Sequence, residues 1–134
     1  MSTTGNKETA RRFVDALGRG DTEGVAAVLT PDATAYARGS SALSGVRNRE
    51  EILATVGFLG QLAPDGIAFE VLDVTAEDNR VALSAAGRGE LVNGVTYEND
   101  YCFVMFFRDG KIERLQEMFD TKRADEVILP LMSG

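Results

Sequence analysis

Two glutamates and an arginine are the side chains of this sequence best suited to acid–base chemistry: Arg88, Glu90 and Glu117. The chain has no histidine and a single cysteine, Cys102. That composition excludes histidine-dependent triads, zinc sites of the Cys/His kind and an internal disulfide. Two carboxyl groups bridged by an arginine in a partly dry pocket can have pKa values that are driven apart, so that one acts as an acid and the other as a base.

The turn at Asn93-Gly94 decides which side chains lie beside Arg88 and Glu90. Asn-Gly between alternating runs is a strong hairpin signal, because both residues tolerate positive φ. A two-residue loop sets Glu90 opposite Tyr97 and Arg88 opposite Asn99, and directly opposed residues share a face of the sheet. We therefore expect one face to be the wall of a pocket. Its members are Arg88, Glu90, Tyr97, Asn99, Tyr101 and Phe103.

A second hairpin decides whether Glu117 joins this face. Its turn can close as a two-residue loop at Asp109-Gly110, which places Glu117 with Cys102 on the opposite face. It can instead close as a three-residue loop with a bulge, which pairs Tyr101 with Glu117. We prefer the second register, because it gathers more apolar side chains onto the face of the expected pocket. These side chains are Leu115 and Phe119.

Composition and charge indicate one small globular domain without a nucleic-acid partner. The 134 residues, 44% of them hydrophobic, suit a single domain over residues 1–134. The net charge of −7 argues against nucleic acid, whose recognition needs a basic footprint. No apolar run approaches the roughly 18 residues that span a bilayer, and residues 1–5 lack the blocks of a signal peptide. We therefore expect a cytoplasmic protein with no membrane partner. The absence of nucleotide-binding glycine motifs and Asp-x-Asp loops leads us to expect no cofactor and no metal.

Hydrophobic periodicity and turn residues divide the chain into helices followed by strands. Apolar residues at helical spacing predict helices over 6–17, after Asp21, and over 48–62, where Asn48 and Glu51 make a capping box. A short strand is expected at 32–38 and a small, polar loop at 39–45. Alternating patterns predict strands at 67–74 and 80–91 and two more in the hairpins. A last short helix starts at Asp120, and the apolar tail at 129–131 lies over a pocket mouth or a partner subunit. This order of elements predicts an α+β domain.

Three segments resemble the cone-shaped fold of nuclear transport factor 2 (NTF2), ketosteroid isomerase and the SnoaL-like polyketide cyclases. They are the helix start Gly20–Val25, the approach to the third helix at Gly45–Ile52, and the strand sequence Tyr101–Ile112. The resemblance covers nearly the whole chain. It implies an NTF2-like α+β cone, in which three N-terminal helices pack on the concave face of a curved antiparallel sheet. Such scaffolds host many activities, so the fold alone leaves the reaction open.

The end of the chain is similar to that of limonene-1,2-epoxide hydrolases, at Glu117–Asp120 and at Leu129–Leu131. In that family the corresponding acids are aspartates. The resemblance implies that Glu117 activates a water molecule, that Glu90 protonates the epoxide oxygen, and that Arg88 bridges the two carboxyl groups. An arginine suits this bridge, because its planar fork can engage both acids.

The same comparison extends the site beyond the charged trio. Tyr36 matches a tyrosine that holds the water molecule, and Arg38 stands where the hydrolases have a water-binding asparagine. With the side chains gathered by the hairpins, these two complete the expected substrate- or water-binding set: Tyr36, Arg38, Tyr97, Asn99, Tyr101, Phe103, Leu115 and Phe119.

Three functions stay open at this point. The leading one is cofactor-free hydrolysis of a small epoxide, with an apolar, oxygen-containing molecule as the partner. The second is a polyketide cyclase or an isomerase of the ketosteroid type that uses Glu117 or Glu90 alone. The third is a non-catalytic binding domain in which the acids are structural. The opposite, mixed face carries Glu98, Asp100 and Cys102, and we expect a homodimer through it.

Overall fold

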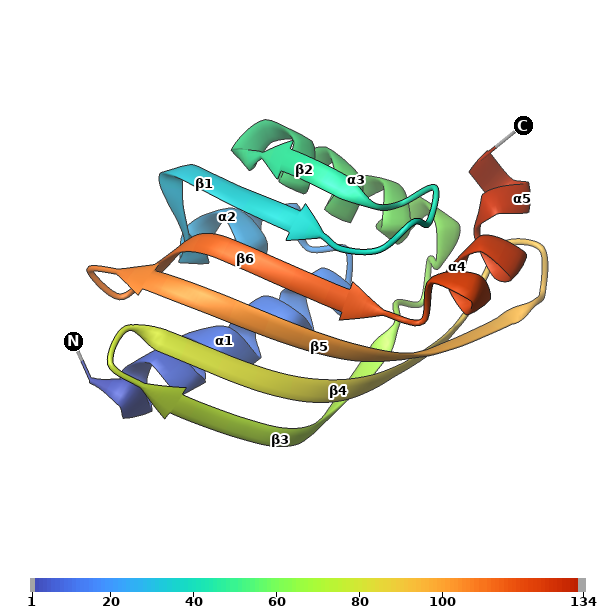
Figure 1. Ribbon diagram of the computed structural model, residues 1–134. Coiled ribbons are helices and arrows are strands. Elements are labelled where there is room, and N and C mark those ends of the chain that lie inside the picture. Colours follow the sequence, from blue (N-terminus) through green and yellow to red (C-terminus); the bar gives the residue numbers. More distant parts are fainter. Residues whose placement is uncertain (1, 133–134) are drawn as a thin grey trace.

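The computed structural model describes residues 2–132, which form one six-stranded sheet and five helices (Figure 1). The ends of the expected domain, Met1 and Ser133–Gly134, lie outside the described residues. Along the sheet the strand order is β2-β1-β6-β5-β4-β3. The strands are β1 (Leu29–Ala37), β2 (Gly45–Asn48), β3 (Ala68–Glu77), β4 (Arg80–Glu90), β5 (Thr96–Arg108) and β6 (Lys111–Phe119).

The sheet is mixed, whereas an antiparallel sheet was expected. Strand β1 runs parallel to β6, and every other pair is antiparallel. These two strands come from opposite ends of the chain, so no hairpin forces them to be antiparallel. Strand β2 was expected to be part of a loop and the start of a helix. It instead forms the edge strand beside β1.

Three N-terminal helices cover one face of the sheet, as expected. They are α1 (Thr3–Gly18), α2 (Thr22–Val28) and α3 (Arg49–Leu62). Figure 1 shows them behind the strands, while α4 (Thr121–Val127) and α5 (Leu129–Met132) lie at one end of the sheet. The capping box of Asn48 and Glu51 at the start of α3 is confirmed, with side chain to backbone bonds of 3.0 and 2.9 Å.

The core fills the space between α1–α3 and the covered sheet face. Phe13 of α1 meets Phe103 of β5 edge to face, with ring centroids 6.1 Å apart. Phe69 of β3 packs against the same ring and against Tyr101. Phe103 and Leu115 are 0% and 2% exposed, so both belong to this dry core. The core therefore fixes which residues of β5 and β6 point toward the helices.

The first hairpin has a different turn from the one expected, and its predicted register is wrong by one residue. Gly94 has positive φ, but Asn93 does not, so the turn is not the two-residue type I′ form. The backbone N–H of Leu91 donates to Val95 O at 2.9 Å and closes a three-residue loop. Glu90 therefore pairs with Thr96, and the whole register moves with it. A slip of one residue moves every side chain of a strand to the other face.

The second hairpin closes through the loop that was not preferred, yet Glu117 faces the helices as expected. Asp109 and Gly110 both have positive φ and form a two-residue loop. A bulge follows, because Phe107 pairs with Ile112 while Phe106, the residue before it on β5, pairs with Arg114. The extra residue returns Glu117 to the covered face. Its partner on β5 is Phe103, where the prediction had Tyr101.

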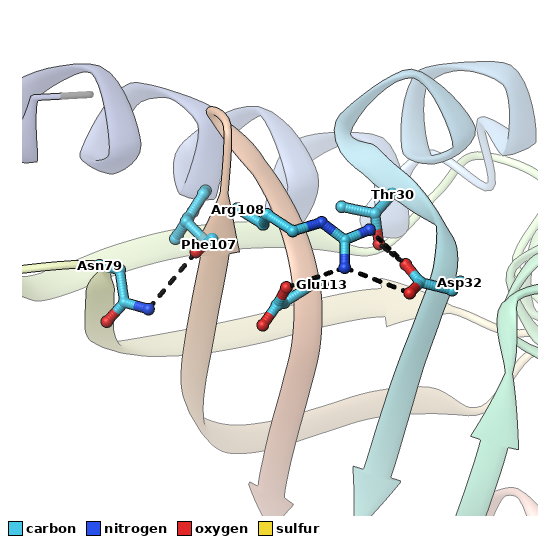
Figure 2. A network of polar contacts seen from close by, with 6 residues as sticks. All are labelled: Thr30, Asp32, Asn79, Phe107, Arg108 and Glu113. Carbon is cyan, nitrogen blue, oxygen red and sulfur yellow. Dashed lines mark hydrogen bonds and ion pairs between the residues drawn. The ribbon is translucent and has the colours of Figure 1, made fainter.

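An ion network holds this bulge in place (Figure 2). Glu113, the extra residue of β6, forms an ion pair with Arg108 at 3.2 Å. The same guanidinium contacts both carboxylate oxygens of Asp32 on β1, at 2.6 and 3.2 Å. Hydrogen bonds from Arg108 and then from Thr30 lower the pKa of Asp32 to about 2. The turn between β5 and β6 is thus tied to the strand beside it.

Two glycines of the helical layer make a matched test of this packing. A Cβ at Gly18 would lie 2.1 Å from Ile67 O and 2.8 Å from the Phe69 ring, whereas at Gly57 the nearest atom is 3.7 Å away. We expect Gly18→Ala to lower the free energy of unfolding by about 2 kcal/mol, because backbone must move. Gly57→Ala should raise it by about 0.5–1 kcal/mol through helix propensity. Urea unfolding measures both, and a Gly18→Ala protein as stable as wild type would contradict this packing.

Candidate functional site

A small cavity lies between the covered face of the sheet and the helices, and Glu117 is in its wall. The cavity has a volume of about 70 Å³. Its lining is mostly apolar and includes Leu17 of α1 and Phe58 of α3. The polar side chains that reach it are Arg47, Thr55, Tyr97, Tyr101 and Glu117. The cavity therefore combines an ionisable acid with mostly apolar walls.

Glu117 is a carboxyl group without a direct partner. It lies on β6 between Ala37 of β1 and Phe103 of β5. Within residues 2–132 its side chain makes no hydrogen bond and no ion pair. Burial raises the pKa of Glu117 to about 7, against the attraction of Arg47. At neutral pH this group populates both protonation states, as a general acid or base must.

Arg47 is a site residue that the sequence analysis missed. It pairs with Ala35 across β1 and β2, so its side chain points toward the helices. Its Nη2 donates to Leu43 O at 2.7 Å, which holds the guanidinium at the cavity wall. The segment was interpreted only as the approach to a helix. Its Gly-Val-Arg-Asn pattern is too short to reveal a strand by alternation.

The tyrosines and the asparagine expected in the pocket form one hydrogen-bonded chain. The Tyr97 and Tyr101 hydroxyls are 2.7 Å apart, and Asn99 Nδ2 donates to Tyr97 at 2.7 Å. Asn99 also binds the backbone of Asp120 twice. Its Nδ2 donates to Asp120 O and its Oδ1 accepts from Asp120 N, at 3.0 Å each. Tyr97 and Tyr101 line the cavity, as does Phe119, whereas Asn99 lies behind them.

Arg88 and Glu90 lie on the opposite, exposed face of the sheet. The corrected register pairs Arg88 with Glu98, and the two side chains form an ion pair there. Arg88 lines an open groove of about 700 Å³, together with Arg123 of α4 and with Asn99. The expectation that Arg88 and Glu90 share a pocket with Glu117 is therefore wrong. The cause is the three-residue loop between β4 and β5.

Tyr36 and Arg38 also face away from the cavity. On β1 it is Ala35 and Ala37 that point inward, and Tyr36 is 39% exposed on the outer face. The Arg38 guanidinium lies 4.5 Å from the centre of the Tyr36 ring, and its Nε donates to Gln116 at 3.0 Å. Neither side chain can bind a water molecule beside Glu117, contrary to the expectation.

Two segments cover the cavity, the connection 38–44 and helices α4 and α5. Asp125 of α4 accepts hydrogen bonds from Ser41 Oγ at 2.7 Å and from Ala42 N at 3.0 Å. These bonds hold Leu43 against the cavity, and Ile128 lines it from the end of α4. The apolar tail packs beside Ile128 through Leu131. Of the two places expected for the tail, this contact favours the pocket.

The described residues offer no sign of a metal site or a membrane span. Within 2–132, no three His, Cys, Asp or Glu side chains lie where they could hold a metal ion. No helix in the same range is long and apolar enough to cross a bilayer.

The fold defines this protein as an NTF2-like α+β domain, and Glu117 lies in a small pocket between its sheet and helices. The chain belongs to the SnoaL-like domain family, whose model matches residues 10–115. No curated protein matches the chain significantly.

Solved structures share the fold over nearly the whole chain. Bal32a, from a soil-derived mobile gene cassette, is 27% identical over 92% of this chain and 96% of its own, with a TM-score of 0.80. PrhC from Penicillium brasilianum is 20% identical over 98% and 90%, with a TM-score of 0.85. A proposed SnoaL-like polyketide cyclase from Jannaschia is 17% identical over 98% and 91%, with a TM-score of 0.75.

The raised pKa of Glu117 predicts a specific dependence of stability on pH. The folded state holds this proton more tightly than the unfolded chain, whose pKa is near the ordinary value of 4.5. Stability should therefore fall as pH rises from about 5 to about 8, by up to about 3 kcal/mol from this group. Glu117→Gln should remove that loss, whereas Glu8→Gln, at an exposed position, should keep it. Urea unfolding at both pH values measures the difference. Equal pH dependence in wild type and Glu117→Gln would contradict the assigned burial.

Proposed function

We propose that this protein transfers a proton to or from a carbon atom beside a carbonyl group, with Glu117 as its single acid and base. The observation that carries the proposal is an unpaired carboxyl in a mostly apolar cavity, with its pKa raised to about 7. This reaction corresponds to the cyclase or isomerase alternative rather than to epoxide hydrolysis. Its substrate is a small, largely apolar compound that carries a carbonyl oxygen.

The reaction needs one group that can both accept and return a proton. Ionised Glu117 removes a proton from the carbon next to the carbonyl, and the electron pair of that C–H bond passes into an enolate. The neutral carboxyl of Glu117 then returns the proton. Return to a different carbon isomerises the substrate. If the enolate carbon instead attacks a second carbonyl, a ring closes, and the proton of Glu117 passes to the oxygen of that second carbonyl. The second outcome corresponds to the activity named for the Jannaschia protein.

Epoxide hydrolysis of the limonene type needs a second carboxyl group across the pocket from the base. Among the described residues that line this cavity, Glu117 is the sole acid. Arg88 and Glu90, which were expected to complete the set, lie on the other face of the sheet. A reaction with a single carboxyl group therefore fits this cavity better.

Substrate size is set by the cover of the cavity. Its volume of about 70 Å³ is below the ~300–1,000 Å³ that is usual for ligand pockets. A substrate with a ring therefore requires the cover to shift, through the contacts of Asp125 with Ser41 and Ala42. Both hydrogen bonds join separate segments, so their loss leaves the core packing intact.

The proposal predicts catalysed hydrogen exchange at carbon. In deuterated water the wild type should exchange the protons between the carbonyls of small 1,3-diketones and of β-keto esters, as followed by proton NMR. Glu117→Gln should lower the rate by at least about a hundredfold, because the general base is lost. The wild-type rate should rise with pH, reach half of its limit near pH 7 and level off as Glu117 becomes fully ionised.

Glu8→Gln serves as the matched control for this assay, since Glu8 is exposed on α1 and does not line the cavity. Exchange that is equal in wild type and Glu117→Gln would remove Glu117 from its role. Binding of diketones without any exchange would favour the non-catalytic binding domain.

We also propose that two copies of this chain pair through the outer face of the sheet. Apolar side chains lie at its centre on β5, among them Val104 and Phe106, both only half-buried. Arg38 directly follows β1 and Asp73 lies on β3, on either side of that centre. A two-fold axis along β5 exchanges the two sides, so that Arg38 of one copy lies over Asp73 of the other. Arg38 and Asp73 are therefore complementary in charge across this axis.

A charge exchange tests this pairing. Arg38→Asp and Asp73→Arg should each weaken the dimer by about tenfold in Kd, because each places like charges together. The double variant restores opposite charges and should recover most of the affinity. Sedimentation at several concentrations measures Kd. A monomeric wild type, or a double variant as weak as the singles, would contradict the arrangement.

A further inference from the structure

The side-chain amide of Asn99 has only one orientation that fits its surroundings. Its Nδ2 donates to Asp120 O at 3.0 Å, while its Oδ1 accepts from Asp120 N at 3.0 Å and from Asp100 N at 2.8 Å. Backbone groups cannot exchange their roles as donors and acceptors, so they fix which end of the amide is which. The amide nitrogen therefore faces Tyr97.

This orientation decides the direction of the next hydrogen bond. Asn99 Nδ2 donates its second hydrogen to the Tyr97 oxygen at 2.7 Å. Tyr97 is 1% exposed, and its other polar neighbour is the Tyr101 oxygen at 2.7 Å. A buried hydroxyl needs an acceptor for its single proton. The Tyr97 hydroxyl therefore donates to Tyr101.

Tyr101 is left with a proton that has no acceptor within residues 2–132. Its oxygen already accepts from Tyr97, and its ring lines the cavity beside Glu117. The O–H of Tyr101 is thus free to point at a molecule in the cavity. Burial raises the pKa of both tyrosines, so both keep their protons through the neutral range.

We propose that Tyr101 donates a hydrogen bond to the carbonyl oxygen of the ligand and to the enolate oxygen that replaces it, and that Asn99, acting through Tyr97, is the residue that aims this donor. This inference rests on the proposed function and adds the oxygen-binding group to it. Tyr101 keeps its proton throughout, and the proton that moves is the one carried by Glu117. Donors in series strengthen one another, and an ionised oxygen gains more from them than a neutral one. The site therefore selects ligands whose oxygen bears or acquires negative charge.

A pair of flat probes separates this hydrogen bond from packing. 2,4-Dinitrophenol binds as its anion at about pH 6, where Glu117 is largely neutral, and 1,3-dinitrobenzene lacks the oxygen. Wild type should prefer the dinitrophenolate. Tyr101→Phe should weaken its binding by about 10- to 100-fold, as expected for a hydrogen bond to a charged group, and leave dinitrobenzene unchanged. Absorbance titration measures both affinities, and Tyr36→Phe on the outer face is the matched control.

Two further variants test the role of Asn99 in aiming the donor. Asn99→Asp replaces the amide donor with a carboxylate acceptor. The Tyr97 hydroxyl should then donate to this carboxylate, and Tyr101 should donate to the Tyr97 oxygen. Dinitrophenolate binding should then fall about as far as in Tyr101→Phe, although Tyr101 is present. Tyr97→Phe keeps the bonds between Asn99 and Asp120 and should cause a smaller loss, about 3- to 10-fold. NMR spectra establish that each variant is folded.

The outcomes are separate from those of the exchange assay. Glu117→Gln should retain the preference for dinitrophenolate, because the amide is neutral like the protonated acid. A wild type without this preference, or a Tyr101→Phe protein that keeps it, would overturn the assignment of Tyr101. Retention of the full preference in both Asn99→Asp and Tyr97→Phe would overturn the aiming role.

Discussion

The bulge at Glu113 is the constraint on which the site depends. A two-residue loop at Asp109-Gly110 would by itself turn Glu117 to the exposed face, beside Cys102. One extra residue in β6 reverses this and brings the carboxyl under the helices. The ion network around Arg108 holds that residue at the end of the sheet. Contacts at one end of the strand thus decide which side chain meets the cavity at the other.

The chemistry of Glu117 depends on the separation between its carboxyl group and the guanidinium of Arg47. An arginine in direct contact would hold the pKa of the carboxyl low and leave it ionised at all relevant pH values. Arg47 is close enough to oppose the effect of burial, yet its guanidinium is engaged by Leu43 O and forms no ion pair with the acid. Desolvation therefore dominates, and the folded protein carries the energetic cost of a buried acid near neutral pH.

Much of the fold was readable from the sequence, because helix caps and apolar periodicity are local signals. The capping box of Asn48 and Glu51 and the role of Asp21 as a cap are confirmed. The site was harder to predict, since strand register depends on the φ of single turn residues. Because Asn93 does not have positive φ, the loop is one residue longer than predicted, and Arg88 and Glu90 lie on the exposed face instead of the covered one. Arg47 was missed because its strand pairs with a distant segment and leaves almost no local pattern.

Asn99 has a second consequence through its partner Asp120, the residue that caps α4. The same short helix carries Asp125, which fastens the segment over the cavity. A displacement of α4 would therefore also move the peptide group that orients Asn99. The alignment of the tyrosine hydroxyls and the cover of the cavity thus depend on the same short helix.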